Sequence, residues 1–288
     1  MRRLINLNQD WKFTGLDGNT IPVNIPHTWN NIDGQDGGND YKRGTCTYRH
    51  TFASPAFRAD SQQVWLEFTG VNASAKVILN GEEVCTHDGG YSTFRADITG
   101  LLKEQNELTV EVDNSKNDRV YPQKADFTFY GGIYRDVNLI VVEKDHFALD
   151  HLGSSGIRVT ATPEGSDATV RVQSRITGGE VRITLLDAQG KEVGAGSGTD
   201  VTIPLKDAHR WHGVEDPYLY ICRPRCSPAA LLPTSWTSPS ASVPSGWTPS
   251  RASSSTTSPS RCTASPGTRT ARVWAMPSPG KCTTRTWR

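Results

Sequence analysis

The chain has 288 residues with 31 basic and 30 acidic side chains, and this near-neutral balance is typical of a soluble protein of one or two domains. No apolar run approaches the ~20 residues that a membrane-spanning helix needs, so we expect no membrane partner. The start, MRRLINLNQDWKF, lacks the continuous apolar core of a secretory signal, and only Cys46 and Cys85 precede residue 222; we therefore expect a cytoplasmic chain without disulfides.

Apolar residues in the first half of the chain mostly recur at every second position, which is the period of a half-buried strand. Val64, Leu66 and Phe68 share one face of QQVWLEFTG, and NELTVEVDN repeats the pattern. The Asn-Gly pair of AKVILNGEEV is favoured in two-residue hairpin turns. RDVNLIVVEK is more continuously apolar. Short strands separated by Gly, Asn and Asp predict an antiparallel sandwich over residues 1–146.

A second set of strands follows, in GIRVTATP, ATVRVQSRI, EVRITLLDAQGKEV and DVTIPL. This set closes with HRWHGVEDPYLYI, in which Pro217 precedes a last strand. Its extent, residues 147–221, is that of a small immunoglobulin-like β-sandwich. The sequence up to residue 221 is therefore predicted to be all-β, with two sandwiches in series.

Several motifs of residues 4–221 occur in the order found at the front of family 2 glycoside hydrolases. They are NLNQDWKF, VNIPHTWN, DGQDGGNDYKRGTCTYRHTF, VWLEFTGVNASAKVILNGEEV, HDGGYSTFRADIT, DFTFYGGIYRDVNLIV and WHGVEDPYLY. The chain resembles this family, and the DGQDGGNDYKRG run resembles its β-galactosidases most. The resemblance implies a jelly-roll, galactose-binding-like domain over residues 1–146 and an immunoglobulin-like domain over residues 147–221.

In the family a (β/α)₈ barrel follows these domains and carries both catalytic glutamates. A retaining mechanism requires two carboxyl groups about 5 Å apart across the scissile bond. The resemblance implies that neither glutamate lies in this chain, so we assign no catalytic residue. We expect no cofactor or metal for this chain, while the resemblance leaves a metal ion open for the full-length family enzyme, and full-length relatives are often oligomeric.

The resemblance nevertheless points to three candidate substrate-binding residues. Asp126, in ADFTFYGGIYRDV, corresponds to an acidic residue that reaches from the jelly roll into the active site of similar β-galactosidases and contacts sugar hydroxyls. Asn39 and Asp40, in GGNDYKRG, lie on a Gly-rich loop that approaches the substrate in the family. The alternatives are a turn-capping aspartate and ordinary loop composition.

Other polar and aromatic residues are assigned structural roles. His27 and His87 have no sequence partner that would make them general bases. Trp29 and Trp65 are expected in the sandwich interior rather than on a sugar. We expect Arg135 to form a structural ion pair, and the glycine pair of YGGIY to allow close backbone approach or positive φ.

Residues 222–288 have a different composition. They hold nine of the 31 basic residues, none of the 30 acidic ones and ten of the 17 prolines, which leaves residues 1–221 with a net charge of −8. An Arg/Ser-rich tail is compatible with RNA binding. Four cysteines are compatible with zinc, but they form no Cys-x-x-Cys pair. We therefore expect neither nucleic acid nor metal as a partner.

Translation in another reading frame explains this tail better. In the alternative frame, each codon consists of the last base of one codon and the first two bases of the next. In this frame Trp274-Ala275 can encode only glycine, and Met276-Pro277 can encode only alanine. Continued in this way, the stretch from Arg251 permits GFFLNDEP-x-PLHGVSRHQDREGLGNA, which resembles the family's entry into its barrel. We therefore interpret residues 222–288 as an out-of-frame, disordered tail, with the break between Tyr220 and Cys226.

Two functional hypotheses follow from the sequence. The first is a truncated N-terminal fragment of a β-galactosidase-like hydrolase that is inactive alone. The second is a jelly roll that acts by itself as a weak, lectin-like module for β-galactosides or related sugars. Sugar titration and a turnover assay distinguish them.

Overall fold

The computed structural model describes residues 2–33, 41–122, 129–228 and 272–274. These residues form strands and one short 3₁₀ helix, so the all-β prediction is confirmed. No helix in the described ranges is long and apolar enough to cross a membrane. The elements are β1 Arg3–Asn6, β2 Trp11–Thr14, β3 Thr20–Val23, β4 Thr45–Ala53, β5 Gln62–Phe68, β6 Ser74–Leu79, β7 Glu82–Asp88, β8 Phe94–Asp97, η1 Thr99–Leu101, β9 Gln105–Asp113, β10 Val137–Glu143, β11 Ile157–Glu164, β12 Asp167–Ser174, β13 Glu180–Leu186, β14 Glu192–Ser197, β15 Asp200–Leu205, β16 Leu219–Ser227 and β17 Arg272–Trp274.

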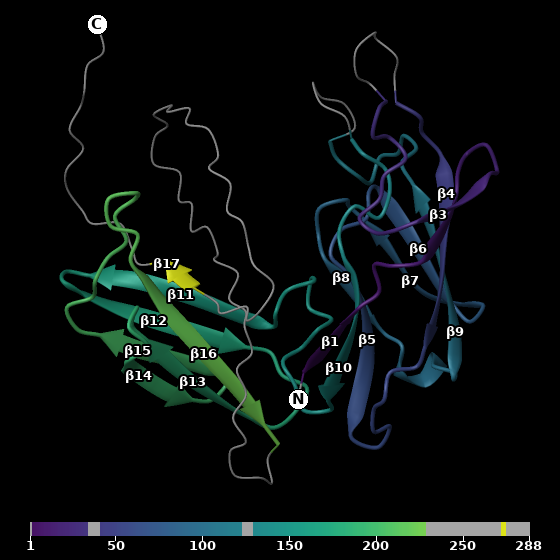
Figure 1. The fold of residues 1–288 in the computed structure, drawn as a ribbon. Coiled ribbons are helices and arrows are strands. Elements are labelled where there is room, and N and C mark those ends of the chain that lie inside the picture. The colour runs from purple at the N-terminus through teal and green to yellow at the C-terminus, as the bar shows by residue number, and fades with distance from the viewer. Residues whose placement is uncertain (1, 34–40, 123–128, 229–271, 275–288) are drawn as a thin grey trace, which may run out of the picture. The chain divides into compact units, whose positions relative to one another are not determined.

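The described chain divides into two compact units. Unit 1 comprises Met1–Lys144 and Leu149–Ser154, and unit 2 comprises Asp145–Ala148 and Ser155–Arg288. In unit 1 a four-stranded sheet of order β1-β10-β5-β8 faces a six-stranded sheet of order β3-β2-β4-β9-β6-β7 (Figure 1). All pairings within these sheets are antiparallel.

The core of unit 1 lies between these two sheets. Burial alternates along β4 and β9, as the two-residue period predicted, because one face of each strand meets the opposite sheet while the other meets solvent. Strands β5 and β10 are buried on both faces instead. Their second face is covered by the returning segment Leu149–Ser154, and there Leu149 packs on Trp65, Ile140 and Val142.

The predicted hairpin turn is present between β6 and β7. Asn80 has φ 55° and Gly81 has φ 90°, so both central residues occupy the left-handed region that this turn requires. Asn80 also donates a hydrogen bond to the carbonyl of Leu101. The turn is thereby connected to the end of η1.

A buried ion pair holds the returning segment on unit 1. Arg95 Nε donates to Glu67 Oε2 over 2.6 Å, and both side chains are less than a tenth exposed. The same guanidinium donates to the carbonyls of Leu149 and Ser154 at 3.1 and 2.7 Å. Asn138 donates to the second oxygen of Glu67. This set of bonds satisfies charges that would be costly to bury unpaired.

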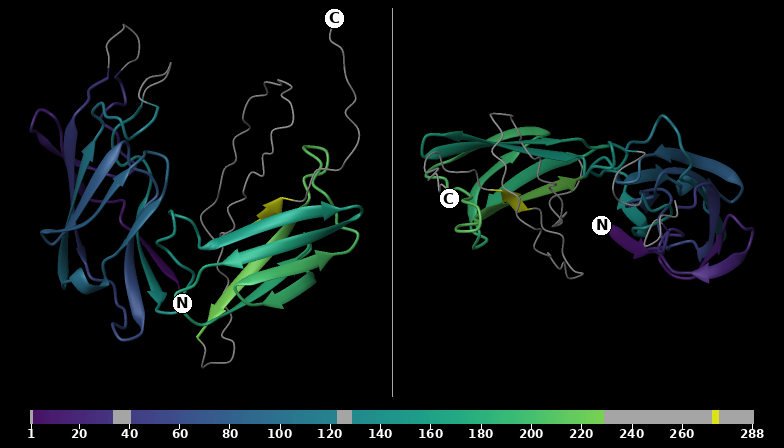
Figure 2. Two further views of the ribbon diagram at one scale, coloured as in Figure 1. Left: turned by 180° about the vertical axis from the view of Figure 1, so that it is seen from behind. Right: turned by 90° about the horizontal axis from the view of Figure 1, so that it is seen from above.

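Unit 2 is a smaller sandwich of two sheets, ordered β11-β12-β15 and β14-β13-β16-β17, and Figure 2 shows it from two further sides. Alternating apolar residues from both sheets form its core, with Val172, Ile183 and Leu185 fully buried. The strands predicted in GIRVTATP, ATVRVQSRI, EVRITLLDAQGKEV and DVTIPL correspond to β11 to β15.

Strand β16 continues beyond the predicted limit of its domain at residue 221 and ends at Ser227. It pairs with β13 in register from Ile221 to its end. The continuation is possible because Cys222 and Pro224 are buried on the inner face, so the alternation persists past the composition change. Most of the predicted tail, 229–271 and 275–288, lies outside the described residues.

Candidate functional site at the loop end of unit 1

The three predicted substrate-binding residues lie outside the described part of the chain. Asn39 and Asp40 fall within 34–40, and Asp126 falls within 123–128. Their binding roles therefore stay predictions. The structure does describe the residues on either side of both segments, and those that flank 34–40 are joined to those that follow 123–128 at one end of unit 1.

Asn30 is at the centre of this junction and is completely buried. Its Oδ1 accepts hydrogen bonds from the amide of Gly131 at 2.8 Å and from Asn114 Nδ2 at 3.1 Å. Its Nδ2 donates to Asp33 Oδ2 and to the carbonyl of Lys42, both at 2.9 Å. One side chain thus connects the residues before and after 34–40 with those that follow 123–128.

Asn114, at the end of β9, adds a second buried amide to this junction. Its Oδ1 accepts from the amide of Gly44 at 2.8 Å, and its Nδ2 also donates to the carbonyl of Lys42 at 3.1 Å. We call Asn30, Asp33, Lys42, Asn114 and Gly131 the loop base. Buried amides with full sets of partners define a single geometry, because alternative arrangements leave polar groups without a hydrogen bond.

Asp33 is the ionisable member of the loop base. Its partial burial acts to raise its pKa, but the hydrogen bonds from the amide of Lys42 and from Asn30 outweigh this, so the pKa lies below the ordinary value of 3.8. The carboxylate is therefore charged at neutral pH and accepts both bonds.

The glycine pair of YGGIY is required at the loop base for steric reasons, as expected. A Cβ on Gly131 would lie 2.4 Å from the ring of Trp29, and Gly132 has φ 132° with the carbonyl of His27 2.5 Å from its would-be Cβ. Trp29 packs parallel to Phe13 with ring centroids 6.0 Å apart and donates to the carbonyl of Lys42. It serves here as a structural residue.

Both histidines that the sequence offered as bases have structural partners. His27 Nδ1 lies 2.8 Å from the hydroxyl of the buried Tyr48, and burial lowers the pKa of His27. His87 stacks on Phe94 with centroids 4.2 Å apart, and its Nε2 lies 3.0 Å from Ser92 Oγ. Burial lowers the pKa of His87 as well.

Two further expectations concern Trp65 and Arg135. Trp65 is buried among aliphatic residues, as expected. The ion pair expected for Arg135 is wrong: its guanidinium donates to the carbonyls of Thr69 and Tyr91 at 3.5 and 3.3 Å. Asp136, the next residue, is turned to the side chain of Asn8 instead.

Exposed aromatic and aliphatic side chains flank the same two segments. Tyr121 and Tyr130 precede and follow 123–128 with 72% and 40% of their surfaces exposed, and Ile32, before 34–40, is 76% exposed. Aromatic rings with a polar hydroxyl are suited to contact with sugar rings. The sequence reasoning missed them because single tyrosines in loops carry no pattern.

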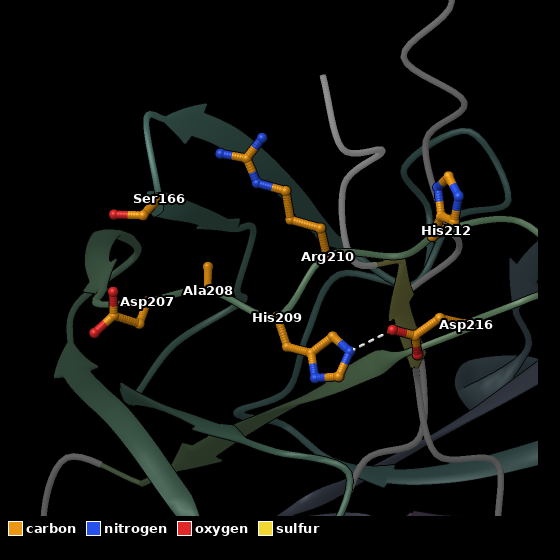
Figure 3. Close-up of a pocket in the computed structure, with 7 residues that line it drawn as sticks. All are labelled: Ser166, Asp207, Ala208, His209, Arg210, His212 and Asp216. Carbon is orange, nitrogen blue, oxygen red and sulfur yellow. Dashed lines mark hydrogen bonds and ion pairs between the residues drawn. The ribbon is translucent and has the colours of Figure 1, made fainter. Parts of the chain in front are cut away.

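A second candidate lies in unit 2, where a shallow pocket of about 480 Å³ opens beside the loop that precedes β16. Figure 3 shows the His209 ring turned toward Asp216, whose Oδ2 lies 2.7 Å from Nε2. The opposite face of this imidazole stacks on Tyr218 with centroids 3.9 Å apart. Arg210 donates to the carbonyl of Gly165.

This second pocket does not align a serine with the His209–Asp216 pair. Ser166 also lines it, but in Figure 3 its hydroxyl points away from the His209–Asp216 pair. No group of three or more potential metal ligands occurs among the residues that the structure describes. Elsewhere, burial raises the pKa of Cys46 and Cys85 to about 11, so neither is a thiolate nucleophile at neutral pH.

Comparisons with known proteins bear on both units. Residues 36–147 match the galactose-binding domain-like sequence model of glycosyl hydrolase family 2. The chain is 31% identical over 245 residues to a β-glucuronidase of Bacteroides fragilis, covering 76% of this chain and 34% of that protein. It is 28% identical over 249 residues to a β-galactosidase of Thermoanaerobacter pseudethanolicus, covering 76% and 32%.

Solved structures show the same relationship. The crystal structure of an FMN-binding β-glucuronidase from Facaelibacterium prausnitzii matches with a TM-score of 0.73 and 39% identity, over 79% of this chain and 38% of that one. A Bacteroides uniformis β-glucuronidase matches with a TM-score of 0.67 and 26% identity, over 78% and 30%.

The chain spans about a third of the length of the relatives that it matches. Their names include glucuronidases as well as galactosidases, so the likeness does not choose between these sugars. The order of motifs, the two antiparallel sandwiches and the matched domain agree: residues 36–147 are a galactose-binding domain-like domain of glycosyl hydrolase family 2, and the chain is similar to the N-terminal third of β-glucuronidases and β-galactosidases.

Proposed function

We propose that this chain is the non-catalytic front part of a retaining β-glycosidase and does not hydrolyse glycosides by itself. The loop base carries this proposal. It joins the described residues on both sides of 34–40 to Gly131, which follows 123–128, and this supports a sugar-binding role for Asn39, Asp40 and Asp126 at this end of unit 1. Carboxylates suit this task because they accept charge-assisted hydrogen bonds from hydroxyls.

The inactivity follows from the chemistry of the reaction. Retaining hydrolysis requires two opposed carboxyl groups about 5 Å apart. The resemblance places both on a barrel, and the matched part of the relatives covers their first third only. Residues 222–288, read as an out-of-frame tail, do not supply a barrel.

Sugar binding by the isolated chain is then weak. A few hydrogen bonds on one side of a sugar contribute on the order of 1–3 kcal/mol, which is less than the binding free energy of a millimolar complex.

Galactose and glucuronate are to be titrated separately into the ¹⁵N-labelled chain, with the amides of Gly131 and Tyr130 and the indole of Trp29 observed by NMR. We expect small, unsaturated shifts at these positions that Asp126→Asn abolishes.

A dissociation constant tighter than about 1 mM, with saturation, would favour the lectin-like alternative instead. Arg158→Gln, on β11 of unit 2, serves as a matched control because its side chain is exposed and lies in the other unit. Shifts in the Asp126→Asn variant as large as those of the unmodified chain would contradict the role assigned to Asp126.

A further inference from the structure

The sheet that contains β16 has an incompletely occupied edge. On one side β16 pairs with β13 from Ile221 to Ser227. On its other side, within the described residues, only β17 pairs with it, at Leu219–Ile221. On this second side, the backbone N–H and C=O groups of Cys222 to Ser227 are therefore not paired with any described strand. Such an edge is a template for a further strand.

The side chains on this part of the edge are strongly basic. Arg223 and Arg225 project from the face opposite the core, and Arg225 lies directly opposite Arg182 of β13. Like charges at directly opposed positions destabilise a sheet. Glu180 lies opposite Ser227, yet the described residues include no ion pair between it and either arginine of β16.

The two arginines also have incomplete hydrogen bonding. The Nε atoms of Arg223 and Arg225 are both shielded from solvent, and neither has a hydrogen-bond partner among the described residues. A buried donor without a partner is unfavourable, and an acceptor on a neighbouring strand would remove this penalty. The charge and the free donors therefore favour the same occupant, a strand with carboxylates on this face.

A second copy of the chain does not fit this edge. An antiparallel copy centred on Pro224 would place Arg223 opposite Arg225 of the other copy, which adds two further like-charge pairs. The inner side of the edge, by contrast, suits small apolar residues, since Tyr220, Cys222 and Cys226 contact the core of unit 2.

We propose that the edge from Cys222 to Ser227 binds an extended, acidic peptide segment by strand addition, with apolar residues toward the core and carboxylates toward Arg223 and Arg225. Main-chain hydrogen bonds supply the affinity and the alternating side chains supply the selectivity. This inference does not depend on the glycosidase assignment.

The test uses the full chain and two short fluorescein-labelled peptides, one alternating valine with glutamate and the other valine with lysine. Fluorescence anisotropy at low salt should show that the glutamate peptide binds about tenfold more tightly than the lysine peptide. Two partly exposed ion pairs, one with each arginine, account for a preference of this size. Added salt should reduce the preference. The double variant Arg223→Glu/Arg225→Glu should reverse it.

A matched variant, Arg158→Glu/Lys191→Glu, changes the net charge equally at exposed positions away from the edge and should keep the preference of the unmodified chain. Three results would overturn the inference. They are equal binding of both peptides, displacement of the glutamate peptide by a single-stranded oligonucleotide, and sedimentation as a dimer that excludes the peptide.

Discussion

At the scale of single residues, two buried amides organise the candidate site. Asn30 and Asn114 share acceptors and donors across segments that are 84 residues apart in the sequence. Sequence reasoning selected Asp126, Asn39 and Asp40 by resemblance but overlooked both amides, because an asparagine in a loop gives no periodic signal. The role of Asn30 depends on long-range contacts, which local pattern does not encode.

Replacement of Asn30 tests the loop base. Asn30→Ala removes four hydrogen bonds and leaves the amide of Gly131 and Asn114 Nδ2 short of an acceptor. We expect a loss of about 3 kcal/mol in the free energy of unfolding of unit 1, measured by urea denaturation. Gln189→Ala, at an exposed turn of unit 2, should change stability by less than about 0.5 kcal/mol. A neutral Asn30→Ala would contradict the arrangement.

Histidines that are buried or partly buried make unit 1 sensitive to pH. Burial lowers the pKa of His27, His50 and His87 below the ordinary value of 6.5 in the folded chain. The unfolded chain binds protons on these rings at higher pH than the folded chain does. Stability is therefore greatest above 6.5 and falls as the pH decreases through 6.5 toward the folded values.

The melting temperature of the full chain, followed by circular dichroism, should accordingly decrease between pH 7.5 and pH 5.5, the interval that spans the ordinary histidine pKa. His27→Gln removes one of the three imidazoles whose pKa is lowered, so the decrease should be smaller in this variant. An increase in melting temperature over the same interval would show that charged histidines are stabilising and would refute the explanation.

At the scale of elements, periodicity predicted the strands well. The alternation in β4 and β9, the hairpin between β6 and β7, and the apolar β10 all appear in the structure. The end of β16 was missed by six residues because the composition change was given more weight than the alternation that continues through it. The covering of β5 and β10 by a returning segment was also missed, since such packing is a tertiary contact.

Replacing the buried ion pair of Arg95 and Glu67 tests how the returning segment Leu149–Ser154 is held. Arg95→Met leaves Glu67 buried without its counter-ion and removes the guanidinium's hydrogen bonds to the carbonyls of Leu149 and Ser154. We expect a cost of about 3–5 kcal/mol for this single change. Arg95→Met/Glu67→Met should be less destabilising, because no uncompensated charge remains. Unfolding in urea gives both values, and equal losses would argue against a stabilising role for the pairing.

At the scale of the whole molecule, the resemblance predicted the family. The composition predicted that residues 222–288 are not part of the two β-sandwich domains. The described fold consists of two β-sandwiches, each with its own core. The matched relatives are about three times as long as the matched part. The sequence did not predict a sugar, because relatives named as galactosidases and relatives named as glucuronidases both match this chain.

The most direct test of the central claim is turnover of chromogenic β-galactoside and β-glucuronide by the purified 288-residue chain. Since the two opposed carboxyl groups of a retaining glycosidase are assigned to a barrel beyond these sandwiches, we predict release of chromophore no faster than in buffer. Hydrolysis at a typical enzymatic rate, about 1 s⁻¹ or more, would place the catalytic pair within this chain and contradict the account.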